Sequence, residues 1–70
     1  MINLRKILTK REKEIFEYLV KNYTTREIAN KISISEKTVR NHISNVIQKL
    51  SVKGRTMAVI ELIKLKEISF

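Results

Sequence analysis

Polar side chains between residues 34 and 50 are of the types that read the edges of bases in nucleic acid. This stretch, ISEKTVRNHISNVIQKL, contains no Pro or Gly, and Ser35 belongs to the residue types that cap helices. Glu36 is its only acidic residue, whereas an ordinary solvated helix face is rich in Glu and Lys. In the major groove of DNA, Arg pairs bidentately with guanine and Asn with adenine. We therefore predict a recognition helix whose base contacts are made by Lys37, Arg40, Asn41 and Ser44.

A second set of polar residues suits phosphate groups rather than bases. Hydroxyls, amides and cations near helix N-termini fix the register of a protein on DNA without reading its sequence. For Thr24, capping of a helix is at least as good an interpretation, and one hydroxyl can serve both roles. The predicted phosphate contacts are Thr24, Thr25, Thr38, Asn45, Lys49 and Arg55.

The length and charge of the chain limit what kind of protein it can be and what kind of partner it can bind. Seventy residues make one small domain with a single core. Fifteen Lys and Arg against seven Asp and Glu give a net charge of +8, which favours a polyanionic partner. The absence of Cys excludes disulfides and thiol chemistry, and no run approaches the roughly 18 apolar residues of a membrane span. We expect a bacterial protein of the cytoplasm, associated with the nucleoid.

Residues that could support catalysis or metal binding are few. His42 is the only histidine, and no Cys or suitably spaced carboxylate pair accompanies it, so a packed structural role is favoured over a metal ligand, catalytic base or pH switch. Tyr18 and Tyr23 could stack on bases, as in single-strand binders, but packing is the better interpretation without an aromatic-lined groove. There is no Gly-rich loop and no nucleophile with a base. We predict no enzyme, no cofactor and no metal.

Four helices are expected to position these residues. The T-x-x-E pattern of a capping box occurs at Thr9 with Glu12 and at Thr24 with Glu27, which predicts two helix starts, and Asn22 is a plausible stop between them. The helix that follows Ser35 carries an apolar stripe at about 100° per residue. That stripe consists of Val39, Ile43, Val46, Ile47 and Leu50.

The connection between the second and third helices is short. The second helix is expected to end near Lys31, and Ile32-Ser33-Ile34 then has the length of the turn in a helix-turn-helix. Such turns often contain Gly, so here Ser33 would have to accept any positive φ. The predicted fold is all-α, a four-helix bundle that contains a helix-turn-helix without a wing.

The fourth helix, expected from residue 55 to about 66, is apolar over more than one face. Gly54, the only glycine, is expected to take a left-handed conformation in the tight connection before it. One stripe is enough to cover the first and third helices, namely Ala58, Val59, Leu62 and Leu65. The apolar surface of the fourth helix that is left over predicts a homodimer interface. Its residues are Met57, Ile60, Ile63 and Lys64. Around the domain, at 9–66, we expect a basic arm at 1–8 and a tail at 67–70 that folds back or frays.

The chain resembles the LuxR-type helix-turn-helix domain over about residues 8–65. The features that carry the resemblance are Leu8-Thr9 with Arg11-Glu12, Glu27-Ile28-Ala29, Ser35 with Thr38-Val39, His42, Lys49-Leu50, and Arg55 with Ala58. The resemblance implies a DNA-binding transcriptional regulator that dimerises through its fourth helix, with Arg40, Asn41 and Ser44 facing the groove. Ser51 stands where the family often has Gly. Within the family the chain is similar to short stand-alone regulators of spore formation, which implies a role in sporulation.

We therefore predict a sequence-specific regulator of transcription that binds double-stranded DNA with paired half-sites as a dimer, with RNA polymerase as a further partner. One alternative is a basic helical module that binds structured RNA or an anionic membrane surface, although Lys and Arg on every helix disfavour the membrane. Another is an interaction module whose fourth helix caps a partner regulator. Met1 favours a complete chain without a sensor domain, in which case control would lie in how much protein is made.

Overall fold

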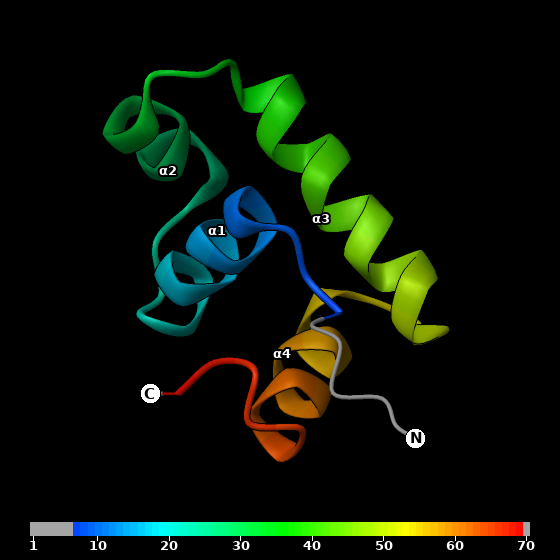
Figure 1. Cartoon of the computed structure of the whole chain (residues 1–70). Helices are drawn as coiled ribbons and strands as arrows, with labels where there is room; N and C mark the ends of the chain where they lie inside the picture. Colours follow the sequence, from blue (N-terminus) through cyan, green and yellow to red (C-terminus); the bar gives the residue numbers. More distant parts are fainter. Residues whose placement is uncertain (1–6, 70) are drawn as a thin grey trace.

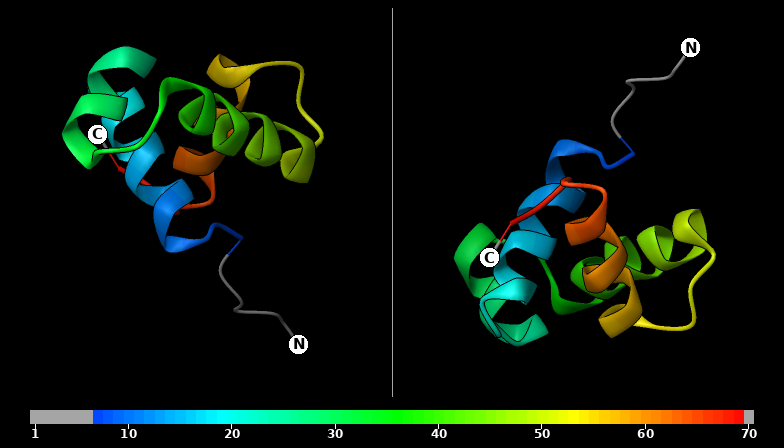
Figure 2. Two further views of the ribbon diagram at one scale, coloured as in Figure 1. Left: turned by 90° about the horizontal axis from the view of Figure 1, so that it is seen from above. Right: turned by 90° about the horizontal axis from the view of Figure 1, so that it is seen from below.

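Four α-helices make up the fold, and the third and longest packs against the other three. The computed structural model describes residues 7–69, with α1 at Lys10–Val20, α2 at Thr25–Ile32, α3 at Glu36–Leu50 and α4 at Arg55–Lys64. Helix α3 contacts α1, α2 and α4, so the bundle is organised along one side of it (Figure 1). The two further views show α3 crossing α1 at a steep angle (Figure 2). The expected all-α architecture with a helix-turn-helix is confirmed.

Side-chain caps fix where the first three helices begin. Thr9 Oγ1 accepts a hydrogen bond from Glu12 N at 3.1 Å, and Glu12 Oε1 accepts one from Thr9 N at 3.0 Å. The same reciprocal pair joins Thr24 and Glu27 at 3.1 and 2.8 Å. Ser35 Oγ accepts from the backbone N–H of Thr38 at 3.0 Å. All three starts were predicted, because each depends only on residues three apart.

The core is formed by the inward faces of all four helices. Val39, Ile43 and Val46 are buried, whereas Ile47 and Leu50 of the same predicted stripe are half-buried. Leu65 was expected in the core and is 45% exposed, because α4 ends at Lys64 and Leu65 only caps it. The buried apolar residues are Leu8, Ile15, Phe16, Ile28, Ala29, Val39, Ile43, Val46, Ala58, Leu62 and Ile68.

Two serines take the left-handed backbone conformation that ends a helix. Ser33 caps α2 with φ 58° and ψ 45°, and Ser51 caps α3 with φ 55° and ψ 43°. Serine lacks the freedom of glycine, so each position carries some strain. The expectation for Gly54 was wrong: its φ of −171° is extended, and a Cβ added there would meet nothing within 4 Å. The left-handed turn before α4 is made three residues earlier, at Ser51.

The ends of the domain pack onto the bundle. Of the predicted basic arm, residues 1–6 lie outside the described part of the chain, while Leu8 is buried. The tail folds back: Glu67 N donates to Leu62 O at 2.9 Å, and Ile68 is buried. Phe70 lies outside the described residues. Between residues 7 and 69, none of the helices has the length and apolar character that crossing a membrane requires.

Candidate nucleic-acid interface

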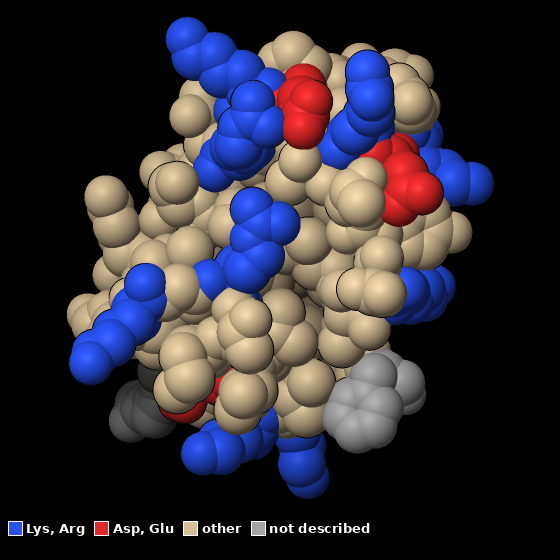
Figure 3. All heavy atoms as spheres, turned by 180° about the vertical axis from the view of Figure 1, so that it is seen from behind, with Lys and Arg blue, Asp and Glu red and all other residues tan. Residues whose placement is uncertain are grey.

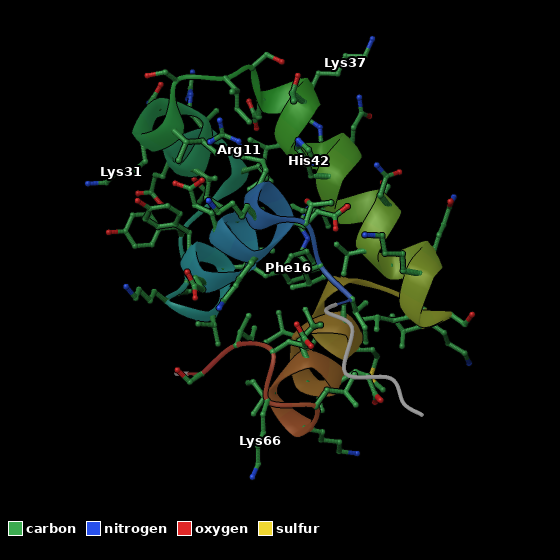
Figure 4. All side chains as sticks on the ribbon, viewed as in Figure 1. Arg11, Phe16, Lys31, Lys37, His42 and Lys66 are labelled. Carbon is green, nitrogen blue, oxygen red and sulfur yellow. The ribbon has the colours of Figure 1, made fainter. Side chains whose placement is uncertain are left out.

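The four residues predicted to contact bases lie together on the outer face of α3. They are Lys37, Arg40, Asn41 and Ser44, and all are exposed. The opposite face of the same helix is held in the core by Val39, Ile43 and Val46, which are buried. Lys37, near the start of α3, projects away from the bundle (Figure 4). Because the inner face is fixed, the outer face presents its side chains from a rigid element, as groove reading requires.

A small polar network ties the start of α3 to α2. Arg40 Nη1 lies 2.9 Å from Glu36 Oε2, one helical turn away. Thr25 Oγ1, from the first turn of α2, donates to the same Oε2 at 2.7 Å. The Thr25 hydrogen bond, followed by that of Arg40, outweighs the effect of desolvation and holds the pKa of Glu36 below its ordinary value. Sequence spacing could have indicated the Glu36–Arg40 pair, but Thr25 is eleven residues away and meets it only through the fold.

The residues predicted to contact phosphate fall into two groups. Arg55 and Asn45 are exposed, as is Thr24, whose hydroxyl also caps α2. Thr25 and Thr38 are half-buried and already make hydrogen bonds. Since Thr25 donates its hydroxyl proton to Glu36, a donated bond from this residue to phosphate would have to come from its backbone N–H.

Lys49 differs from the other predicted phosphate contacts because its ammonium group is bound within the protein. Lys49 Nζ lies 2.5 Å from Glu12 Oε1 and donates to Ile7 O at 3.1 Å. Glu12 is only 3% exposed, and its position in the sequence had indicated capping alone. A lysine ammonium carries three donors, so two of them are used here. The contact of Lys49 with phosphate stays a prediction. At most one N–H of its ammonium group remains to make that contact.

Comparison with known proteins assigns this arrangement to a family. Residues 6–62 match the family described as bacterial regulatory proteins, luxR family. The chain belongs to this family. It is therefore a DNA-binding regulator of transcription.

Individual relatives of this luxR-family chain cover it almost completely. The spore germination protein GerE of Bacillus subtilis (strain 168) is 63% identical over 62 residues, which span 89% of this chain and 84% of GerE. The transcriptional regulatory protein DegU of Brevibacillus brevis is 50% identical over 58 residues, 83% of this chain but only 25% of DegU.

Solved structures agree with the sequence relationship. The structure of the transcription factor GerE has a TM-score of 0.91 at 58% identity and covers 93% of this chain and 97% of its own. The response regulator ChrA of a heme-sensing two-component system has a TM-score of 0.84 at 35% identity, over 94% of this chain and 33% of ChrA. The luxR-type fold thus occurs both in a protein of this size and as a part of a much longer one.

Charge on the luxR-family domain is predominantly positive and widely spread. On the face turned away from Figure 1, Lys and Arg side chains project from many places, with only a few acidic groups among them (Figure 3). Two carboxylates that contact α3 residues, Glu12 and Glu36, are paired with Lys49 and Arg40. These pairs reduce the repulsion that unpaired acids close to α3 would exert on phosphate.

The sequence also singled out His42 and two tyrosines, and these side chains pack within the fold. His42 is half-buried on the inner part of α3 (Figure 4), and within residues 7–69 no three His, Cys, Asp or Glu residues are grouped to hold a metal. Tyr18 and Tyr23 pack against each other with ring centroids 5.0 Å apart, and Lys31 Nζ lies 5.9 Å from the Tyr23 ring centre. The packing interpretation of the two tyrosines is confirmed.

Proposed function

We propose that this luxR-family regulator places α3 in the major groove of specific DNA sites and reads bases through the exposed outer face of that helix. The observation that carries the proposal is the gathering of Lys37, Arg40, Asn41 and Ser44 on one exposed face whose other side is locked in the core. Arg40 and Asn41 have the strongest base preferences, for guanine and adenine respectively. Lys37 and Ser44 contact neighbouring bases or the backbone.

Phosphate contacts flank this helix and set its register. Thr24, Asn45 and Arg55 are exposed on three different helices or their caps. Thr25 contributes through its backbone N–H at the start of α2, where unpaired N–H groups favour an anion. Thr38 and Lys49 have internal partners and make weaker contributions. Binding should therefore combine a sequence-independent electrostatic part with base recognition from α3.

The regulator acts as a homodimer through α4. Met57 and Ile60 are 49% and 43% exposed, an unusual state for large apolar side chains on adjacent turns of one helix. Lys64 is exposed on the same side of α4, and half-buried Ile63 borders it. A symmetric pair of these helices covers the apolar surface and presents two recognition helices to paired half-sites.

Cellular context follows from the ligand and from the relatives. A regulator that binds chromosomal DNA works in the bacterial cytoplasm, in association with the nucleoid, and RNA polymerase is the partner through which it alters transcription. The similarity to the spore germination protein GerE supports a role in sporulation.

Selection of bound sites from random duplexes tests the proposal. The expected outcome is an enriched motif with two related half-sites, bound at least about a thousandfold more tightly than a scrambled duplex in roughly 0.15 M salt. A matched structured RNA serves as the competitor for the alternative RNA-binding module. Failure to enrich any motif, or equal affinity for the RNA, would overturn sequence-specific recognition of duplex DNA.

A further inference from the structure

One acidic side chain lies at the proposed base-reading face, and its surroundings are unusual. Glu36 begins α3, immediately before Lys37 and one turn before Arg40. A carboxylate that approaches the phosphates of DNA is repelled by them, so it weakens binding unless it does something else. Glu36 is 41% exposed at its side chain, which means that it is not there to fill the core.

Ordinary helix energetics explain only part of this arrangement. An acid in the first turn of a helix interacts favourably with the helix dipole, and an i,i+4 pair with Arg stabilises the helix slightly further. Both effects arise within α3. Neither requires the hydroxyl of Thr25, which comes from another helix and donates to the same carboxylate oxygen at 2.7 Å.

The hydrogen bond from Thr25 restrains the carboxylate, and the carboxylate in turn restrains Arg40. An isolated surface ion pair leaves two long side chains free to rotate. Here Oε2 receives Thr25 Oγ1 and Arg40 Nη1 together, so the position of that oxygen is fixed from both α2 and α3. The anchor is therefore built by the helix-turn-helix as a whole.

The anchored guanidinium retains the donors that base recognition needs. Arginine carries five N–H donors in a planar fork, and one end of the fork, Nη1, faces Glu36. The edge formed by Nε and Nη2 remains available for two parallel hydrogen bonds to guanine O6 and N7. An arginine held by one nitrogen is also less free to swing toward a neighbouring phosphate.

We infer that Glu36, held by Thr25, is a positioning residue that orients Arg40 for base recognition and so sets specificity at the base pair that Arg40 reads. This inference rests on the proposed contact of Arg40 with a base. Glu36 touches no base itself and acts through the guanidinium. Thr25 has the same role one step further from the DNA, in addition to any phosphate contact of its backbone.

Removal of the carboxylate should have opposite effects on specific and non-specific binding. In Glu36→Ala, affinity for random duplex should stay level or rise, because a negative charge has been removed from the DNA face. Discrimination against a substituted base pair at the Arg40 position should fall about threefold to tenfold, part of the roughly fivefold to 150-fold expected for the whole Arg–guanine contact. A merely structural role would lower both affinities together.

Matched variants separate orientation from charge. Glu14→Ala removes one carboxylate from an exposed pair with Arg11 on α1 and should change random and specific binding alike. Glu36→Gln keeps an acceptor oxygen without the charge and should retain part of the discrimination. Thr25→Val keeps the carboxylate but removes its anchor, and should lose discrimination without any change in net charge. In an Arg40→Ala background, Glu36→Ala should cause no further loss.

Dissociation constants for the selected duplex, its single-base variants and random duplex decide the question, with thermal melting of each variant as a check of folding. If Arg40→Ala lost discrimination but Glu36→Ala and Thr25→Val did not, this inference would be wrong while the proposed function stood. If the wild-type chain bound all duplexes equally, the proposed function itself would fail. Should Glu36→Ala not fold, Thr25→Val and Glu36→Gln give the same test.

Discussion

Lys49 Nζ lies 2.5 Å from Glu12 Oε1 and thereby joins the last turn of α3 to the first turn of α1. The same carboxylate oxygen also accepts the backbone N–H of Thr9, so one group serves both the helix cap and the packing of two helices. Glu12 is buried, and a buried carboxylate is tolerated only when its charge and lone pairs are satisfied. Lys49 therefore stabilises the folded domain through its ion pair with Glu12.

Lys49→Met should destabilise the domain by about 3 kcal/mol, near the low end for removal of one partner from a buried ion pair, because Lys49 is itself partly exposed. The double variant Glu12→Gln with Lys49→Met should recover much of this loss, since no buried charge is then left unpaired. Urea unfolding measures both, and exposed Lys53→Met is the control. Unchanged stability in Lys49→Met, together with uniformly weaker duplex binding, would restore the phosphate contact as its main role.

Acid should weaken the same link. Burial alone would raise the pKa of Glu12, but the hydrogen bonds from Lys49 and Thr9 and the nearby positive charge together lower it below the ordinary 4.5. A lowered pKa in the folded state means that the contribution to stability is complete above about pH 4.5 to 5 and is lost as the pH falls through the folded-state value.

Urea unfolding between about pH 7 and pH 3 should therefore show a smaller acid loss in Glu12→Gln than in the wild-type chain. Glu36 has a lowered pKa as well, so the comparison is best made in a shared Glu36→Gln background. If the free energy of unfolding fell with pH in parallel for the two proteins, Glu12 would not contribute to the loss of stability in acid.

Local signals predicted most of this fold, and contacts distant in sequence were the part they missed. The capping boxes at Thr9 and Thr24 were correct because each needs only a hydroxyl and an acid three residues apart. Gly54 was wrong because glycine permits a left-handed conformation without requiring one, and Ser51 supplied the turn. Lys49 lies 37 residues from Glu12, and Thr25 lies 11 residues from Glu36. No periodicity connects either pair.

Two positions of the α3 stripe should respond differently to truncation. Val46 is fully buried, and Val46→Ala should lower the free energy of unfolding by about 1–2 kcal/mol through the missing methyl groups and the cavity left behind. Leu50 is half-buried at the end of α3. Leu50→Ala should therefore lower the free energy of unfolding by an amount at or below the low end of the about 2–5 kcal/mol that is typical of core leucines. Melting followed by circular dichroism compares them. An unchanged midpoint for Val46→Ala would show that the inner face of α3 is misassigned.

Salt and sequence should separate the two classes of DNA contact. Binding of a dimer with several phosphate contacts per subunit should fall with a log–log salt slope of about −5 or steeper. Arg55→Ala should weaken all duplexes alike and make the slope less steep by about 1 for each phosphate that is no longer neutralised. Asn41→Ala should leave the slope unchanged and reduce discrimination at one base pair by about 1–3 kcal/mol. If Arg55→Ala changed the sequence preference and Asn41→Ala did not, the proposed orientation of α3 on DNA would be wrong.

Apolar surface on α4 should matter only when two copies meet. Met57 and Ile60 lie one turn apart and are exposed, while Ala58 and Leu62 of the same helix are buried. Ile60→Glu places a charge on the outer side of α4 and should leave the monomer folded. In a symmetric interface the two new carboxylates would face an apolar surface and each other, which strongly disfavours pairing.

The Ile60→Glu variant should therefore lose cooperative occupation of paired half-sites about 10–10.5 base pairs apart, yet still bind one half-site at high protein concentration. Leu65→Glu is the matched control, because Leu65 is equally exposed but lies five residues on, about 140° around the helix from Ile60. It should keep cooperativity. Gel-shift titrations on single and paired half-sites, with normal melting curves for both variants, complete the test. If folded Ile60→Glu occupied paired sites as cooperatively as the wild-type chain, the dimer would be formed by a surface other than α4.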